Sequence, residues 1–216
     1  MNGGTATLTA RRLAIAVEAR GLRHRFGPRV ALEPQTFSFG EGGVVAATGP
    51  NGSGKSTLLR IVAGLLRPSG GESVVTLDGR AISAFDRRKV LGFSSPELSF
   101  YDEFTTSENL EFAARSALAA LERVNLAERA GDRVGTLSSG LRQRLRLAFA
   151  TLGDPPLLLL DEPGSHLDDD GHALVERVVR EGAGRGLVLL ATNDEREWRL
   201  AERRIQLRGR DLGHSA

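Results

Sequence analysis

The segment 49–57 constrains this chain more than any other part of its sequence. It reads Gly-Pro-Asn-Gly-Ser-Gly-Lys-Ser-Thr and fits the pattern G-x-x-x-x-G-K-[ST], which cradles phosphate groups. Its glycines let the backbone curl so that successive N–H groups face phosphate oxygens. The apolar run 44–47 before it predicts a buried strand, and a helix is predicted over 56–63. The segment therefore predicts a nucleotide site on a strand–loop–helix unit.

Lys55 and Ser56 carry the chemistry of this loop. The chain has 27 arginines and only two lysines, so a lysine here departs from its usual choice of basic residue. Arginine also binds phosphate, but as a broad fork and not as a point charge small enough for the loop. The Ser56 hydroxyl is a suitable ligand for Mg²⁺. The residues expected to bind the nucleotide are Gly49, Pro50, Asn51, Gly52, Ser53, Gly54, Lys55, Ser56 and Thr57.

Composition excludes several other classes of site. The chain has no cysteine, which excludes disulfides and Cys-ligated zinc. Its formal charge is +2 with the basic residues scattered, so we expect no direct nucleic-acid partner. No apolar run approaches the ~18 residues of a spanning helix, and we expect no signal peptide. The expected location is cytoplasmic.

Apolar periodicity predicts an α/β organisation. Short strands before and after the loop predict a small antiparallel sheet, and the alternation of strands and helices after residue 43 predicts a parallel one. Thr105 and Glu108 match a capping box at a helix start, whereas Gly21 and Gly182 are predicted to mark a turn and a helix end. The predicted strands are 13–20, 30–40, 73–77, 89–93, 157–160 and 187–191, and the predicted helices after the loop are 105–125, 140–152 and 170–181.

Two carboxylates follow the predicted strand 157–160. A carboxylate at a strand end beside a phosphate loop is placed to hold Mg²⁺, and the next one is placed to face an attacking water. We therefore assign Asp161 to the metal and Glu162 to general-base catalysis or water positioning.

A third motif lies between the loop and the carboxylates. Residues 137–144 read Leu-Ser-Ser-Gly-Leu-Arg-Gln-Arg, and Ser138 and Ser139 stand where a helix begins. The free N–H groups at a helix start form an anion site. An ordinary helix cap explains the same residues, and taken alone the segment favours that interpretation.

In this order, the three motifs resemble the ATP-binding cassette (ABC) family over residues ~13–208. Segment 49–57 matches its Walker A loop, 137–144 its signature, and the segment from Asp161 to Asp168 its Walker B strand end and the loop after it. The resemblance implies a P-loop NTPase core with a RecA-like parallel sheet, an antiparallel β subdomain and a short helical subdomain at approximately 101–152. It also implies a disordered tail over 1–10 and a single nucleotide-binding domain over 11–216.

The resemblance further implies ATP and Mg²⁺ as cofactors and a second cassette, a homodimer or a paralogue, as partner. Two cassettes would stack head to tail, with Ser138, Ser139 and Gly140 facing the nucleotide of the other copy. Phe26 matches the aromatic residue on which adenine stacks. A separate membrane-spanning permease subunit would hold the protein peripherally on the inner face of the cell membrane.

Two positions depart from the family pattern. After the strand 89–93 the family has a glutamine that reaches Mg²⁺, but here Pro96 stands at that position with Glu97 next to it. Glu97 is either a substitute metal ligand and catalytic group or an exposed loop charge. Where the family has a histidine on the γ-phosphate, this chain has Asn193, which donates only a neutral hydrogen bond. These departures predict slow hydrolysis.

The sequence thus favours the ATPase subunit of an ABC transporter. One alternative is a non-transport ABC switch protein, and another is a nucleotide sensor with weak turnover. A small-molecule kinase would leave the signature unexplained. The helical insert is short, which fits an exporter-type subunit better than a large importer, but the transported cargo stays open.

Overall fold

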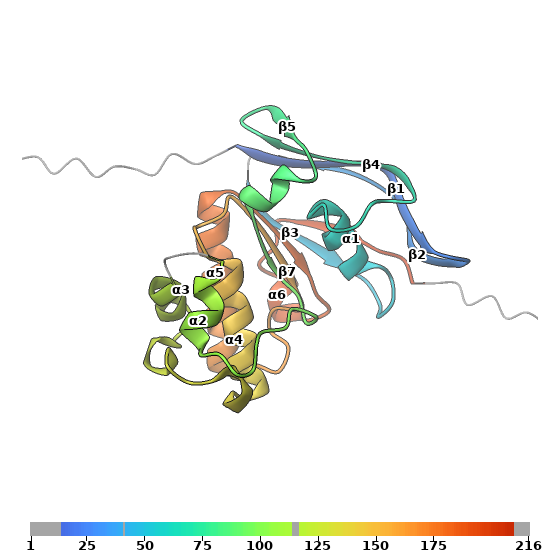
Figure 1. Ribbon diagram of the computed structural model, residues 1–216. Coiled ribbons are helices and arrows are strands. Elements are labelled where there is room, and N and C mark those ends of the chain that lie inside the picture. Colours follow the sequence, from blue (N-terminus) through green and yellow to red (C-terminus); the bar gives the residue numbers. More distant parts are fainter. Residues whose placement is uncertain (1–13, 41, 114–116, 210–216) are drawn as a thin grey trace, which may run out of the picture.

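Two β-sheets and a group of helices make up the structure, which is a computed structural model describing residues 14–40, 42–113 and 117–209 (Figure 1). The predicted tail over 1–10 lies outside these residues. The strands are β1 Ile15–Phe26, β2 Arg29–Phe39, β3 Gly43–Thr48, β4 Gly70–Leu77, β5 Arg80–Ile82, β6 Leu91–Ser94, β7 Leu157–Asp161, β8 Leu187–Ala191 and β9 Arg203–Gln206. The helices are α1 Lys55–Val62, α2 Thr106–Glu111, α3 Ala117–Arg123, α4 Ser139–Ala150, α5 Asp169–Arg185 and α6 Glu195–Trp198.

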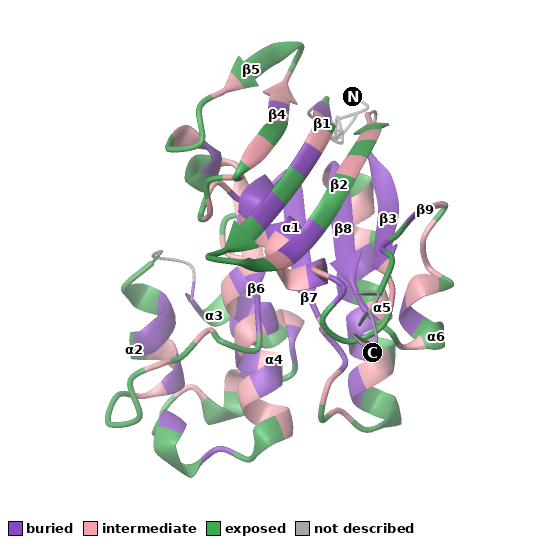
Figure 2. Cartoon of the chain, turned by 90° about the vertical axis from the view of Figure 1, so that its right-hand side faces the viewer, coloured by how far each residue is buried: buried purple, intermediate pink, exposed green. Residues whose placement is uncertain are grey.

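The central sheet is parallel and has the strand order β6-β7-β8-β3-β9. Every residue of β7 and β8 is buried, as Figure 2 shows at the middle of the sheet. Strands covered on both faces need apolar side chains at every position, which explains the uninterrupted leucine and valine runs. The predicted parallel α/β sheet is confirmed.

Alternate residues of these strands build two separate cores. Leu158 and Leu160 of β7 belong to one core, together with residues of α4 and α5. Leu157 and Leu159 point to the other face and join α1 and the antiparallel sheet. Side chains of a strand alternate between its two faces, so one leucine run serves both layers.

The second sheet is antiparallel, with the order β2-β1-β4-β5, as predicted. The turn predicted at Gly21 is wrong, because β1 continues through this residue. Gly21 has φ +55° at an irregularity in the strand pairing, and its N–H donates to the Thr36 hydroxyl at 2.9 Å. A glycine inside a strand therefore marks a bulge here and not a strand end.

The helical segment beside the central sheet consists of short helices. The capping box predicted at Thr105 is confirmed, because its hydroxyl accepts from the Glu108 N–H while the Glu108 carboxylate accepts from the Thr105 N–H. The single helix predicted over 105–125 is wrong: α2 ends at Glu111 and α3 begins at Ala117. Both helices pack on α4, so each carries apolar residues at helical spacing. This shared pattern is why the sequence predicted one continuous helix.

Other predicted boundaries also move, and two of them have a clear physical reason. The helix end predicted at Gly182 is wrong, because α5 continues to Arg185. A Cβ at Gly182 would lie 2.9 Å from Val188 Cγ2 and 3.0 Å from Leu158 Cδ2, so this glycine permits close packing of helix on sheet. Strand β6 begins at Leu91 and not at Lys89, because Asp86–Lys89 forms a 3₁₀ turn.

No helix in the described part of the chain is long and apolar enough to span a bilayer.

Candidate nucleotide site

The strand order assembles a site at the carboxyl edge of the parallel sheet. In the register of β7, β8 and β3, Asp161 pairs with Ala191, and Ala191 pairs with Ala47. The segments that follow these three strands therefore leave the sheet side by side. They carry Glu162, Asn193 and the phosphate loop, which are far apart in the sequence.

The phosphate loop depends on glycines at close backbone contacts. Gly49 has φ +148°, and a Cβ there would lie 2.4 Å from the Leu207 carbonyl oxygen. Gly54 has φ +100° directly before α1, and a Cβ there would lie 2.3 Å from the Ala31 carbonyl oxygen. Side chains at either position would meet backbone atoms, so the loop keeps this curl only with glycine. Helix α1 then directs its positive end into the curl.

Lys55 lies inside the loop with only 6% of its surface exposed. Its Nζ donates to the carbonyl oxygens of Gly49 at 2.8 Å and Pro50 at 3.3 Å. Burial lowers the pKa of the Lys55 amine, and the nearby carboxylates of Glu162 and Asp161 oppose this by favouring the charged form. The ammonium group is thus held in a small cradle beside two acids.

Asp161 and Ser56 bring together two side chains whose oxygen atoms could ligate a metal ion. Burial raises the pKa of the Asp161 carboxyl group, and the nearby Ser56 hydroxyl opposes this shift by favouring the charged form. The Asp161 Oδ1 atom is buried with no hydrogen-bond partner among the described residues. A buried carboxylate oxygen without a partner, next to a hydroxyl, suits the oxygen ligation that Mg²⁺ requires. Ser56 and Asp161, two of the three predicted metal residues, therefore fit the ion.

Glu162 and Asn193 face a second part of the site. Glu162 has φ +48°, an unusual conformation for a residue with a side chain, and its N–H donates to the Ala191 carbonyl at 2.8 Å. Asn193 donates from Nδ2 to Asn51 Oδ1 at 2.8 Å, which joins the end of β8 to the phosphate loop. Glu162, Asn193 and Asn51 all line a hollow of about 290 Å³.

Phe26 lies at the open end of the site. It is half exposed, and it lines a hollow of about 480 Å³ together with residues of the phosphate loop, Glu97 and Glu162. His24 packs edge-on against its ring with centroids 4.5 Å apart, and the Ser69 hydroxyl lies 3.3 Å from His24 Nδ1. The Phe26 ring is therefore supported on one side while it remains available beside the phosphate loop.

Glu97 lines the same hollow but contacts an arginine. Its carboxylate forms an ion pair with Arg60 of α1, and it remains largely exposed. Arg60 in turn lies close enough to Asp161 to favour its charged form. The structure thus places Glu97 in the same hollow as Ser56 and in contact with Arg60.

The signature residues lie apart from this chain's own nucleotide site. The Ser138 hydroxyl caps α4 by accepting from the Leu141 N–H at 3.3 Å, and Ser139 and Gly140 begin the helix. A Cβ at Gly140 would lie 3.1 Å from the His166 carbonyl oxygen. Gly140 therefore adjoins the segment 165–168, and none of the three residues lines the hollow around the phosphate loop.

Two buried residues near the site were not predicted from the sequence. Gln143 of α4 donates to carbonyl oxygens at the end of β7. Glu197 of α6 accepts from the Gly164 N–H at 2.7 Å, and burial raises the pKa of its carboxyl group. Only the packing of α4 and α6 brings these side chains to the turn after β7. Gln143 lies within the signature segment 137–144, whereas Glu197 belongs to no motif named above.

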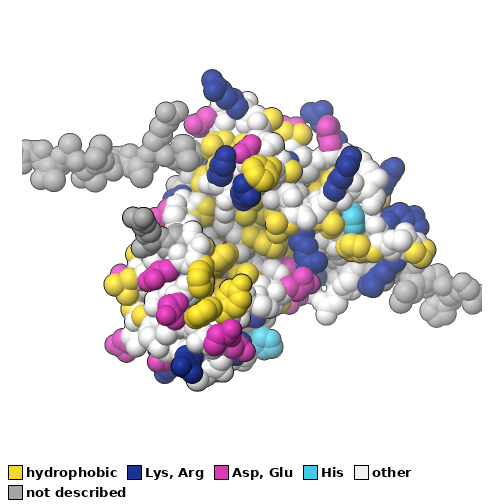
Figure 3. All heavy atoms as spheres, in the orientation of Figure 1, with side chains coloured by type: hydrophobic (Ala, Val, Ile, Leu, Met, Phe, Trp, Pro, Cys, Tyr) yellow, Lys and Arg dark blue, Asp and Glu magenta, His cyan; other side chains and the backbone are white. Residues whose placement is uncertain are grey.

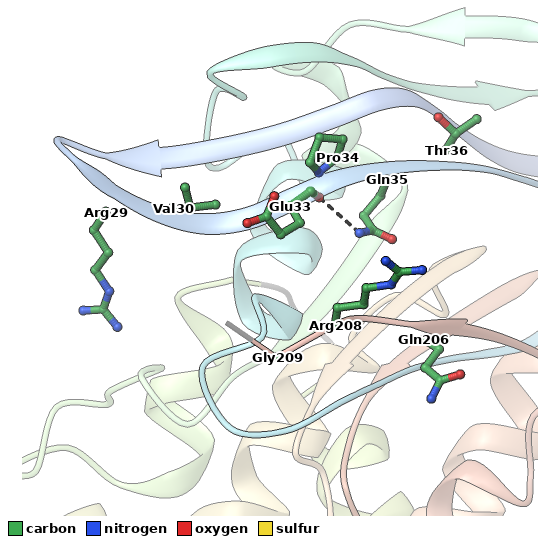
Figure 4. Close-up of a pocket in the computed structure, with 9 residues that line it drawn as sticks. All are labelled: Arg29, Val30, Glu33, Pro34, Gln35, Thr36, Gln206, Arg208 and Gly209. Carbon is green, nitrogen blue, oxygen red and sulfur yellow. Dashed lines mark hydrogen bonds between the residues drawn. The ribbon is translucent and has the colours of Figure 1, made fainter. Parts of the chain in front are cut away.

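A larger polar hollow of about 900 Å³ lies between β2 and the segment after β9 (Figure 4). Its lining includes Arg29, Glu33 and Arg208, and Figure 4 shows Arg208 near Gln35. It shares only Arg29 with the hollow around the phosphate loop. None of the motif residues lines it, whereas residues of the phosphate loop and Glu162 line the smaller hollows.

Sequence comparison relates the chain to known transport proteins. The family model described as ABC transporter matches residues 32–165. The aliphatic sulfonates import ATP-binding protein of Burkholderia cenocepacia is 40% identical over 189 residues, covering 84% of this chain and 57% of that protein. The Nod factor export ATP-binding protein I of a Rhizobium species is 32% identical over 218 residues, covering 94% of this chain and 71% of that protein. The chain spans a little over half the length of several curated relatives it matches.

Structural comparison finds the same architecture in a solved cassette. A dimeric ATP-binding cassette in a post-hydrolysis state, bound to ADP and Pi, superposes with a TM-score of 0.74 at 27% identity. The match covers 88% of this chain and 94% of that chain. The α/β fold predicted for the chain is thereby confirmed.

Proposed function

This chain belongs to the ABC transporter family, and on that premise we propose that it binds and hydrolyses ATP as the nucleotide-binding subunit of a transporter. The observation that carries the proposal is the cluster of Lys55, Ser56, Asp161 and Glu162 at one edge of the sheet. This cluster combines a buried ammonium group, two side-chain oxygens suited to Mg²⁺ and the carboxylate of Glu162. These are the groups that phosphoryl transfer to water requires.

The loop residues bind and orient the triphosphate. Lys55 exchanges its contacts with the Gly49 and Pro50 carbonyls for phosphate oxygens, which are stronger acceptors because they are charged. The N–H groups of the loop and the first turn of α1 bind the remaining phosphate oxygens. Phe26 supports the adenine ring at the open end of the hollow.

Glu162 accepts the proton from the attacking water. Glu162 directly follows Asp161 at the end of β7, so its side chain would lie next to the last phosphate. Ser56 and Asp161 would hold Mg²⁺, which neutralises charge on the phosphate oxygens when it is bound. Asn193 donates one neutral hydrogen bond to the γ-phosphate in place of a charged one, which makes turnover slow.

The partner in the catalytic unit is a second cassette. Ser138, Ser139 and Gly140 stand at a helix start and do not line this chain's own hollow, so they are free to face the nucleotide of another copy. Their neighbour, the segment 165–168, would lie at the dimer interface. The dimeric state of the ADP-bound relative supports this arrangement.

The partner in the membrane is a separate permease subunit that docks on the helical segment. Tyr101, Phe104 and Phe112 form an exposed cluster with ring centroids 5.4–5.9 Å apart. An apolar groove of about 550 Å³ that includes Phe93 and Phe149 lies between β6, α1 and α4. Figure 3 shows hydrophobic side chains gathered on the face over this segment. Exposed apolar patches of this kind mark protein-binding surfaces.

Hydrolysis is tested by Mg²⁺-dependent phosphate release from ATP, with Glu162→Gln as the matched variant. We expect the variant to bind ATP as well as the unaltered chain and to lose phosphate release about 10²-fold or more, because a glutamine cannot take the proton. Equal rates for the two proteins would remove Glu162 from the mechanism. Tight ATP binding without measurable turnover in either protein would favour a nucleotide sensor.

The transport role is tested by affinity capture from detergent-solubilised membranes. The Glu162→Gln variant with MgATP should hold the dimer closed and retain its partner. A stoichiometric polytopic membrane protein would support the proposal and indicate a cargo class. Recovery of soluble proteins alone would favour a non-transport switch.

A further inference from the structure

Gln143 is a fully buried amide on α4. None of its surface is exposed, and its Nε2 donates to the carbonyl oxygens of Pro163 at 2.9 Å and Glu162 at 3.3 Å. A buried amide is costly unless it is hydrogen-bonded, so its contacts are specific. They join the helix that begins with the signature to the turn that carries the proposed general base.

The Glu162 backbone needs such support. Its φ of +48° places it in the left-handed region, which is strained for a residue with a side chain. The Glu162 N–H donates to the Ala191 carbonyl of β8. The Glu162 carbonyl accepts from Gln143 Nε2 and from the Ser165 N–H, the latter at 3.2 Å. Contacts on both sides of the residue hold the strained conformation and thereby the direction of the carboxylate.

Arg146 sets the orientation of the amide. It lies three residues further along α4, and its Nη1 donates to Gln143 Oε1 at 3.1 Å. This contact directs Nε2 toward the two carbonyl oxygens. Arg146 Nε also donates to the Leu98 carbonyl at 3.0 Å, next to Glu97. The pair therefore connects the Glu97 segment to the Glu162 turn.

We propose that Gln143, oriented by Arg146, is a positioning residue that aims Glu162 for hydrolysis. This inference rests on the proposed function, since it concerns the rate of the step that Glu162 catalyses. Among the described residues, Gln143 forms no hydrogen bond with the phosphate loop, with Ser56 or with Asp161. Nucleotide binding and turnover should therefore respond differently to its loss.

The test compares Gln143→Met, which keeps the length but donates nothing, with the unaltered chain. We expect kcat to fall about 10- to 100-fold, as for displacements of a catalytic group by about 1 Å, with the ATP dissociation constant unchanged within about threefold. Thr151→Val is the matched control: Thr151 is equally buried at the far end of α4 and donates to Ala148 at 3.0 Å. It should leave kcat unchanged.

A kcat within twofold of the unaltered chain in folded Gln143→Met would overturn the inference while leaving the ATPase proposal intact. Failure of the unaltered chain to release phosphate would instead overturn the proposed function and the inference with it. If Gln143→Met does not fold, Arg146→Met provides the second arm. It leaves the amide in place but unoriented, and it should lower kcat about threefold or more at constant ATP affinity; an unchanged kcat contradicts the inference.

Discussion

Gly92 of β6 is the position where one added methyl group should damage the chain most. A Cβ at this position would lie 1.7 Å from the Ala150 carbonyl oxygen, 2.8 Å from the Ala150 carbonyl carbon and 2.9 Å from Pro155 Cγ. Real Cβ atoms essentially never approach closer than 3.0 Å, so the end of α4 must retreat by about 1.3 Å. The obstacle is backbone and not a flexible side chain.

Little at the end of α4 can give way. Ala150 and Thr151 are fully buried, and the Thr151 carbonyl accepts from Arg123 at 3.2 Å. Overpacking costs about 1–3 kcal/mol, and a clash between two backbones belongs at the upper end. We therefore expect Gly92→Ala to lower the free energy of unfolding by about 3 kcal/mol, which is about 6–12 °C in Tm for a chain of this size.

Urea unfolding of the nucleotide-free protein measures this loss. Gly184→Ala is the matched control: Gly184 is exposed on α5, and its added Cβ would have no atom within 4 Å. Alanine there should stabilise the helix by about 0.5–1 kcal/mol. A loss below about 1 kcal/mol in Gly92→Ala would refute the packing argument, because it would mean that α4 moves freely against β6.

Three further predictions concern the site. Asn193→His should raise kcat about tenfold, because a charged donor is worth about 1.4 kcal/mol more than a neutral one; an unchanged kcat in phosphate-release assays would contradict the weak-donor explanation. Glu97→Ala should raise the Mg²⁺ concentration for half-maximal turnover about tenfold, because it removes a carboxylate that can ligate the ion. In the unaltered chain this carboxylate is available because its exposed ion pair with Arg60 contributes little free energy. An unchanged Mg²⁺ titration would show that Glu97 is only an exposed charge of the loop. Burial raises the pKa of Glu197 above its ordinary value of 4.5, so above that pH the folded chain keeps a proton that the unfolded chain has released, and the free energy of unfolding should fall as the pH rises further. Glu197→Gln should reduce this slope in urea unfolding, and identical slopes would contradict the assignment.

Local sequence is sufficient wherever a short segment determines its own backbone. The phosphate loop predicted between a strand and a helix lies between β3 and α1. The leucine run forms β7 because four apolar residues between prolines and acids suit a strand covered on both faces. The capping box at Thr105 also forms as predicted, because its two hydrogen bonds span only three residues.

Two glycines were wrongly predicted to end an element, because the role of a glycine depends on the residues that pack against it. Gly182 has the sequence pattern of a helix end, but it lies inside α5 where Val188 and Leu158 approach too closely for a side chain. Gly21 has the pattern of a turn, but neighbouring strands hold it in a bulge of β1. The atoms that decide these cases lie outside the local segment.

The sequence by itself determined the chemistry of this protein: a phosphate loop with Lys55 and two acids after a buried strand, because these motifs are contiguous. Only the tertiary structure decided how they meet. The order β7-β8-β3 places the acids beside Asn193 and the loop, and the packing of α4 places Gln143 on the Glu162 turn. Strand order and side-chain contacts between distant segments follow from the burial of two cores. The spacing of residues within a single motif does not predict them.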